Sequence, residues 1–213
     1  MSDSLPPVPR PDESVAAPAV PVVPVPVVAE PAAVAPKTLR VVGALILLAG
    51  ILHVLSYFAP FELAILLGLM QSLALVGVFV IFVRAGFPHR GTLPRVVSIA
   101  LIVVYALAGV SLLAAGSPAF IAITILLGLL TLALGVTFGI VTMRTPGISP
   151  RIARLPIGLY LALFLLGQAS SRMGEELAGI LPALAYLLVG VMFMAFANRA
   201  VAEPVAAPAP PVG

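Results

Sequence analysis

The sequence predicts an all-α integral membrane protein, a bundle of six membrane-spanning helices with disordered termini. Three observations predict this class. Of the 213 residues, 62% are hydrophobic and 9% are charged, compared with roughly 45–50% and ~25% in soluble domains. Charge-free stretches of bilayer length recur along the chain, because a hydrocarbon core of ~30 Å needs roughly 20 helical residues. Basic residues gather in the segments between these stretches.

Both ends of the chain are predicted to be disordered tails. Residues 1–36 contain ten prolines among alanines and valines, with no aromatic residue. This composition favours extended conformers and cannot build a core. Residues 200–213 have a similar composition and predict a second tail. The transmembrane domain is therefore expected to cover residues 37–199.

Six helices are expected within this domain. A charge-free run at residues 96–143 would cover ~72 Å as one helix, so it must turn back, and residues 115–118 hold its one cluster of Gly, Ser and Pro. Pro94, Pro156 and Pro182 are expected at helix starts, where the missing N–H has no cost. The predicted spans are 38–58, 62–84, 95–115, 118–143, 155–170 and 179–198.

The distribution of basic residues predicts the orientation. With six spans, nine of the ten basic residues that flank them fall on one side, and Arg172 lies alone on the other. Cytoplasmic loops carry the excess of Lys and Arg, so both termini are expected in the cytoplasm. The excess of arginine over lysine and the abundance of Ala, Val, Gly and Pro indicate a bacterial protein. We therefore expect a multi-pass protein of the cytoplasmic (plasma) membrane, the bacterial inner membrane.

A sequence repeat favours an organisation as three tandem hairpins. The segments that begin at Ile65 and Ile125 both read Ile-Leu-Leu-Gly-Leu, and each lies 19 residues before a basic residue, Arg84 or Arg144. Related hairpins in the same orientation would form a parallel repeat about an axis near the membrane normal. Chance similarity between apolar helices is the alternative explanation.

One face of the fourth predicted span carries small and hydroxyl residues. Their spacing of three or four positions places them on one side of a helix. Such residues let helices approach closely in lipid, which predicts a packed seam inside the bundle. Self-association through helix 118–143 is the alternative. The seam consists of Thr124, Gly128, Thr131, Gly135, Gly139 and Thr142.

Three polar residues within the spans form the candidate intramembrane site: His53, Gln71 and Gln168. An ionisable side chain at bilayer depth is a functional hypothesis by default. His53 has no second histidine or cysteine in a span, so neither a metal site nor a haem is predicted, and no cofactor is expected. The structural interpretation is a neutral imidazole bonded to a neighbouring helix. An outward-facing polar vestibule is the functional alternative.

Catalytic motifs are not recognisable in this sequence. There is no cysteine, no aspartate follows Asp12, and no glycine-rich phosphate loop occurs. The sequence therefore predicts no catalytic residue and no enzyme. The arginines flank apolar helices instead of forming a footprint for nucleic acid, so we expect the lipid bilayer and other membrane proteins as partners.

Two functions follow from these observations. The first is a non-catalytic accessory or scaffold subunit that binds other membrane proteins, which rests on the small-residue seam and on the tails. The second is a small uncoupled transporter or channel with an outward-facing polar site. The sequence resembles no family more specific than small multi-span membrane proteins.

Overall fold

The computed structural model describes residues 35–88, 91–145, 148, 150–173 and 175–202, with side chains described except at 168–179 and 198–202. The predicted tails, 1–36 and 200–213, therefore lie outside the described residues apart from 35–36 and 200–202.

Helices account for every described secondary-structure element. Six segments are long and apolar enough to cross a membrane, so the predicted six-span all-α class is confirmed. The short α5 lies in a segment predicted to be a loop. The elements are α1 (Pro36–Phe58), α2 (Phe61–Ala85), α3 (Thr92–Ser111), the 3-10 turn η1 (Leu112–Ala114), α4 (Pro118–Arg144), α5 (Pro150–Ala153), α6 (Leu155–Met173) and α7 (Glu175–Ala202).

Proline and glycine set several of the helix ends. Pro36 and Pro118 occupy the first positions of α1 and α4, where the fixed φ of proline suits a helix start. Gly86 ends α2 with a φ of 67°, and Gly116 has a φ of 94° in the turn before α4. Residues other than glycine rarely adopt this left-handed backbone conformation, so these two turns depend on glycine.

The prediction that Pro182 begins the last helix is wrong. α7 starts at Glu175, which places Pro182 inside it. A proline in a helix interior removes one backbone hydrogen bond, but neighbouring helices can compensate for that loss within a membrane. Hydropathy missed the true start because the first turn of α7 is polar, with Glu175 and Glu176.

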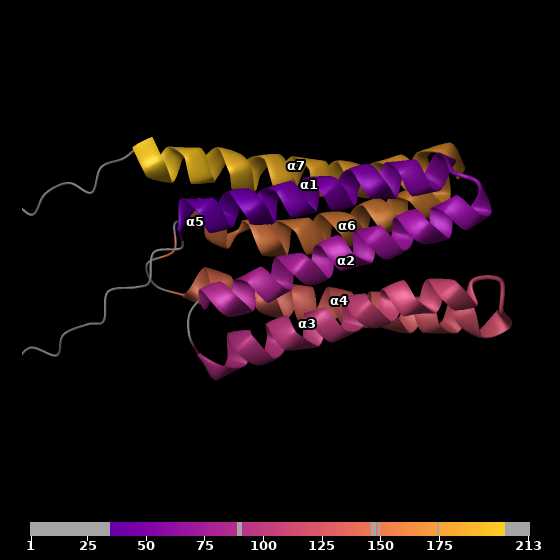
Figure 1. Ribbon diagram of the computed structural model, residues 1–213, viewed down its shortest axis with the longest axis horizontal. Helices are drawn as coiled ribbons and strands as arrows, with labels where there is room; N and C mark the ends of the chain where they lie inside the picture. Colours follow the sequence, from indigo (N-terminus) through magenta and orange to yellow (C-terminus); the bar gives the residue numbers. More distant parts are fainter. Residues whose placement is uncertain (1–34, 89–90, 146–147, 149, 174, 203–213) are drawn as a thin grey trace, which may run out of the picture. The chain divides into compact units, whose positions relative to one another are not determined.

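The six spanning helices form a closed ring. Each packs against the helix before and after it, α4 packs against α6, and α7 closes the ring against α1. The start of α1, the end of α2 and the end of α7 lie at one end of the bundle, here called the terminal end (Figure 1). The opposite end, called the distal end, carries the α1–α2 and α3–α4 turns, the end of α6 and the start of α7. The three hairpins follow one another around this ring, while their proposed duplication stays a prediction.

Glycines let α1 and α7 close the ring at short range. A Cβ atom added to Gly43 would lie 2.8 Å from the Gly190 carbonyl oxygen, and one added to Gly190 would lie 2.9 Å from the Gly43 oxygen. The two backbones therefore touch without intervening side chains. Close approach of this kind supplies van der Waals contact where apolar burial gives no net drive.

Phenylalanine side chains fill the central axis of the helix bundle toward the terminal end. Phe82 of α2 stacks on Phe138 of α4 with ring centroids 5.6 Å apart, and Phe193 of α7 lies 6.4 Å from Phe82. Phe79 and Phe87 complete this group, which we call the phenylalanine cluster. Helices that are not neighbours in the ring thus meet through their side chains, and all five rings are buried.

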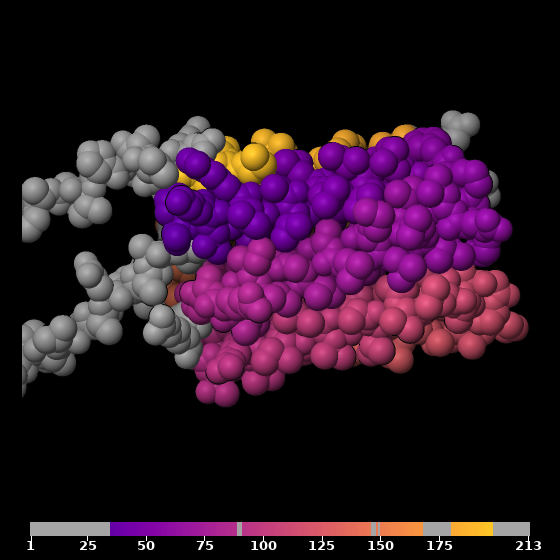
Figure 2. Space-filling view, in the orientation of Figure 1, coloured from indigo at the N-terminus to yellow at the C-terminus, as the bar shows by residue number. Residues whose placement is uncertain are grey.

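The outer surface of the ring is apolar. Large hydrophobic side chains face outward along the helices, among them Leu73 at 68% exposure and Ile121 at 66%. Figure 2 shows α1, α2 and α3 side by side on one such face. This surface suits contact with the hydrocarbon core of a lipid bilayer.

Candidate functional site

A cavity of about 550 Å³ lies inside the ring, in its distal half. It is lined by α1, α2, α3, η1, α4 and α7. It reaches Phe61 and Phe120 near the distal turns and extends to Leu75 and Thr131 near the middle of the bundle. We call it the central cavity. Its volume falls in the range of ~300–1,000 Å³ that is typical of small-molecule sites.

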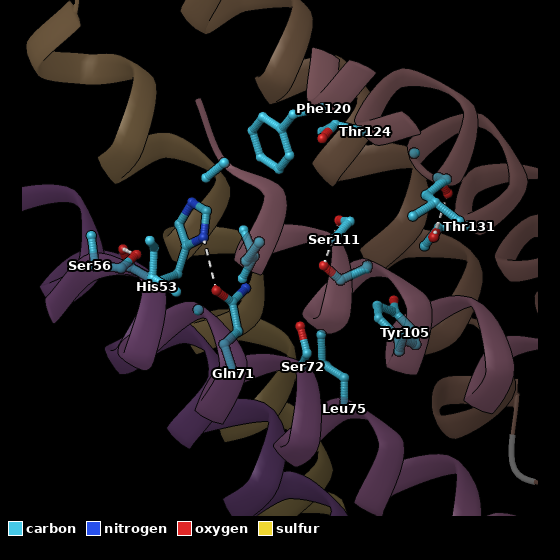
Figure 3. A pocket seen from close by; sticks show the side chains of 18 of the residues that line it. His53, Ser56, Gln71, Ser72, Leu75, Tyr105, Ser111, Phe120, Thr124 and Thr131 are labelled. Carbon is cyan, nitrogen blue, oxygen red and sulfur yellow. Dashed lines mark hydrogen bonds between the residues drawn. The ribbon is translucent and has the colours of Figure 1, made fainter. Parts of the chain in front are cut away.

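Neutral polar groups form part of the described lining, together with apolar side chains. An imidazole, an amide, hydroxyls and phenols face a common space (Figure 3). These groups can exchange hydrogen bonds with an uncharged solute at little electrostatic cost. The polar lining residues are His53, Ser56, Gln71, Ser72, Tyr105, Ser111, Thr124, Thr131 and Tyr186.

The cavity brings together two of the three residues predicted as an intramembrane site. The Nδ1 atom of His53 on α1 lies 3.3 Å from the Oε1 atom of Gln71 on α2. An amide oxygen only accepts hydrogen bonds, so Nδ1 is the donor in this contact. The side chain of the third predicted residue, Gln168, lies outside the described residues.

Three tyrosines, which the sequence analysis missed, extend this polar group. The Tyr186 ring of α7 lies 6.3 Å from the His53 ring, and Tyr186 also interacts with Gln71. The hydroxyls of Tyr105 on α3 and Tyr160 on α6 lie 3.2 Å apart. All three tyrosines are buried. Tyrosine in membrane proteins concentrates at the interfaces, so tyrosines inside three predicted spans were the signal that could have found them.

Several hydroxyls of the lining donate to their own helix. Ser56 donates to the His53 carbonyl over 2.9 Å, and Ser111 donates to the Ala108 carbonyl over 2.8 Å. Thr131 bonds the carbonyl one turn earlier in α4 over 2.8 Å. Each hydroxyl oxygen keeps acceptor capacity while its proton is engaged. These oxygens can therefore accept hydrogen bonds from a solute in the cavity.

The predicted seam of α4 divides between two environments. Thr124, Gly128 and Thr131 line the central cavity. A Cβ atom on Gly128 would meet nothing within 4 Å. The second half of the seam instead packs inside the bundle.

In that second half, a Cβ atom on Gly139 would lie 2.5 Å from the Ile157 Cβ atom on α6. Gly135 packs directly against the Tyr160 ring. Thr142 is buried and donates to the Phe138 carbonyl over 2.7 Å. The α4–α6 contact therefore depends on glycine at two successive turns.

Two smaller spaces lie between the central cavity and the terminal end of the bundle. A void of about 20 Å³ shares Leu75 and Tyr105 with the cavity, and its other lining residues are apolar apart from Tyr160. A pocket of about 280 Å³ at the terminal end shares Phe82 with that void and is lined by Arg84 and Arg95. The phenylalanine cluster thus separates the polar cavity from a basic pocket at the other end of the bundle.

The described residues contain no group of three or more His, Cys, Asp or Glu side chains placed to hold a metal ion.

Comparisons with known proteins gave no match, whether with protein-family models, curated proteins or solved structures.

Proposed function

We propose that the protein binds a small uncharged solute in the central cavity and lets it cross the membrane without coupling to an ion gradient. The observation that carries this proposal is a cavity of about 550 Å³ that extends inward from the distal end and is lined by neutral hydrogen-bonding groups. Coupled transporters place ionisable networks inside the bilayer. The imidazole, amide and hydroxyl lining suits a neutral polar solute better than an ion.

The same geometry weakens the case for an accessory role, which depended in part on the small-residue seam. Gly135 and Gly139 are already occupied by α6, and Gly128 opens into the cavity. The half of the seam at Gly135 and Gly139 is therefore not available to an external partner. We also propose that the protein is not an enzyme.

The proposed orientation places the distal end outside the cell and both termini in the cytoplasm. It is supported by the sequence, in which nine of the ten basic residues that flank the spans fall on the side of the termini. The cavity would then face outward from the cytoplasmic membrane of a bacterium. Reporter fusions at Ser117 should behave as external and fusions at Gly91 as cytoplasmic. The reverse pattern would contradict this topology.

Passage requires the phenylalanine cluster to open. Phe82 and Phe138 lie in stacked contact between the small void and the basic pocket. A hydrophobic constriction of this kind can block water and solute until its side chains move. We propose that motion of these rings connects the two ends of the pathway.

Swelling of proteoliposomes in uncharged polyols of graded size tests the proposal. The wild-type protein should increase permeability to one size class above that of empty liposomes. Gly128→Leu should reduce the increase, because Gly128 lines the cavity as well as a pocket of about 300 Å³ between α4 and α6, and an added Cβ atom there meets nothing within 4 Å. Gly158→Leu is the matched control, since Gly158 also has nothing within 4 Å of an added Cβ atom but does not line the cavity. Equal swelling with wild type and Gly128→Leu would contradict the assignment.

A second candidate, an accessory subunit, rests on the exposed surface of α4. In an apolar 18-residue stretch of each span, 11% of α4 is buried inside the bundle, compared with 28–39% of the other spans. Ile125 and Leu129 are 60% and 58% exposed on this helix. A second copy or another membrane protein could cover this surface. Because the chain has no cysteine, Ile125→Cys provides a single site for crosslinking in native membranes, and a discrete crosslinked product would favour this candidate.

A further inference from the structure

A groove of about 400 Å³ lies between α6 and α7, apart from the central cavity. Arg151 and Arg154, at the terminal end, contribute its basic part. Its remaining lining is apolar and includes Gly158 of α6 and Ala185, Met192 and Phe196 of α7. The groove therefore combines cationic groups at one end with a hydrocarbon surface along its length.

The length of the groove matches one leaflet of a bilayer. Ala185 and Phe196 are 11 positions apart on α7, which corresponds to ~16 Å along a helix. Half of a hydrocarbon core of ~30 Å is nearly the same length. The arginines precede α6 and so lie at the level expected for lipid headgroups at the terminal end.

The surface of the groove is open to an occupant. Both arginines and Gly158 are exposed, and an added Cβ atom on Gly158 would meet nothing within 4 Å. Two guanidinium groups can form charge-assisted hydrogen bonds with a phosphate. A soluble anion would use the arginines but would leave the apolar length unfilled.

We propose that this groove binds an anionic phospholipid of the leaflet at the terminal end, with its phosphate at Arg151 and Arg154 and an acyl chain along α6 and α7. Charge complementarity selects the headgroup, and the apolar lining accommodates the chain. The lipid would cover the joint between α6 and α7, one side of the ring that encloses the central cavity. The proposal does not depend on solute transport.

Thermal unfolding of the full-length protein in mild detergent, with lipid added, tests the proposal. Phosphatidylglycerol should stabilise the wild-type protein, whereas phosphatidylcholine with the same acyl chains should give little stabilisation. Glycerol 3-phosphate should also have little effect, because it lacks the chain. Equal stabilisation by phosphatidylcholine would overturn the role of the arginines, and equal stabilisation by glycerol 3-phosphate would overturn the role of the groove.

Two sets of variants separate specific binding from general attraction of charge. Arg151→Gln with Arg154→Gln should weaken phosphatidylglycerol binding about thirty-fold, because both charge-assisted contacts with the phosphate are lost. Arg84→Gln with Arg95→Gln removes the same charge from the terminal end and should leave binding within about two-fold of wild type. Equal weakening in both double variants would overturn the proposal.

The acyl-chain part of the site has its own variant. Gly158→Leu should fill the groove and weaken phosphatidylglycerol binding, while its unfolding temperature without lipid stays near that of wild type. Gly128→Leu is the control, because it fills the central cavity instead. Unchanged lipid binding in Gly158→Leu would overturn the placement of the chain. A change in molecular mass in detergent on Gly158→Leu would overturn it too, because it would assign the groove to a second copy of this protein.

Discussion

The side chains that point to the ring axis change in size between the distal and terminal halves of the bundle. In the distal half, α2 and α4 contribute several small or hydroxylated residues: Gly68 and Ser72 on α2, Thr124 and Gly128 on α4. In the terminal half the same two helices contribute Phe79, Phe82 and Phe138, which are buried against one another. One ring of helices thus encloses a cavity at one end and a packed aromatic core at the other.

This difference teaches that side-chain volume, more than polarity, decides where a membrane bundle is hollow. In lipid, the outer and inner faces of a helix can both be apolar, because burial of apolar groups between helices gives no net drive. Close packing then depends on whether the side chains fill the axis. Where glycine and hydroxyl residues face the axis, space remains and polar groups can line it.

The largest expected effect is a difference in water access between the two halves. The chain has no cysteine, so single cysteines report single sites. Thr124→Cys in the cavity should react with a membrane-impermeant maleimide added outside intact cells. Val78→Cys, at a position that is 2% exposed in the packed half, should remain unlabelled.

Three other outcomes of this labelling are informative. Equal labelling at both positions would remove the distinction between the halves. No labelling of Thr124→Cys even in permeabilised cells would mean that the cavity is closed to water. Labelling of Thr124→Cys only after permeabilisation would keep the cavity but reverse the proposed orientation.

The next effect concerns stability within the packed half. Phe138 is 1% exposed and contacts three other rings of the phenylalanine cluster. Phe138→Ala should lower the free energy of unfolding by about 3–5 kcal/mol, because it leaves a cavity in a filled core. Unfolding in mixed detergent micelles measures the loss.

Phe120→Ala is the matched control in the hollow half, because Phe120 lines the central cavity and its loss would only enlarge existing space. Its cost should be a small fraction of that of Phe138→Ala. Similar losses for both variants would mean that the two halves are equally well packed.

A smaller effect divides the seam of α4 at its middle. Gly139→Leu should cost about 1–3 kcal/mol of stability, because the added side chain must displace Ile157 and the backbone of α6. Gly128→Leu makes the same substitution on the same helix but enters open space, so its stability should stay near that of wild type. Folded yield and thermal stability in mild detergent measure both. Equal behaviour of the two variants would show that the seam is not divided.

Hydropathy and proline placement predicted the six spans, but they could not predict the ring. A buried residue such as Leu101 and a lipid-facing residue such as Leu73 are chemically alike, so the sequence does not mark which face points inward. The contact between Gly43 and Gly190 was missed because an isolated glycine in an apolar helix does not identify the helix that packs against it. Pro182 was misplaced because the polar first turn of α7 lies outside the hydropathic span.

The candidate site was only partly predictable. His53 and Gln71 stood out because polar groups at bilayer depth are costly. Their contact could not be predicted, because it depends on the rotation of α1 relative to α2. The tyrosines were missed because a phenol reads equally well as an aromatic core residue or as an interfacial anchor. Only their burial on three different helices distinguishes them.

The smallest expected effect concerns a hydrogen bond that crosses the interior of the bundle. Tyr105 and Tyr160 lie on α3 and α6, which are not neighbours, and their hydroxyls are 3.2 Å apart. Tyr105→Phe should cost roughly 0.6–1.7 kcal/mol, the size of interhelical hydrogen bonds in membranes. Once one hydroxyl is gone, the other has already lost this partner, so the double variant with Tyr160→Phe should cost less than the sum of the single variants. Tyr57→Phe, at an exposed position near the distal end, should change stability by less than about 0.5 kcal/mol. Strict additivity of the two buried substitutions would show that the hydroxyls act independently, and the contact across the ring would then come from ring packing alone.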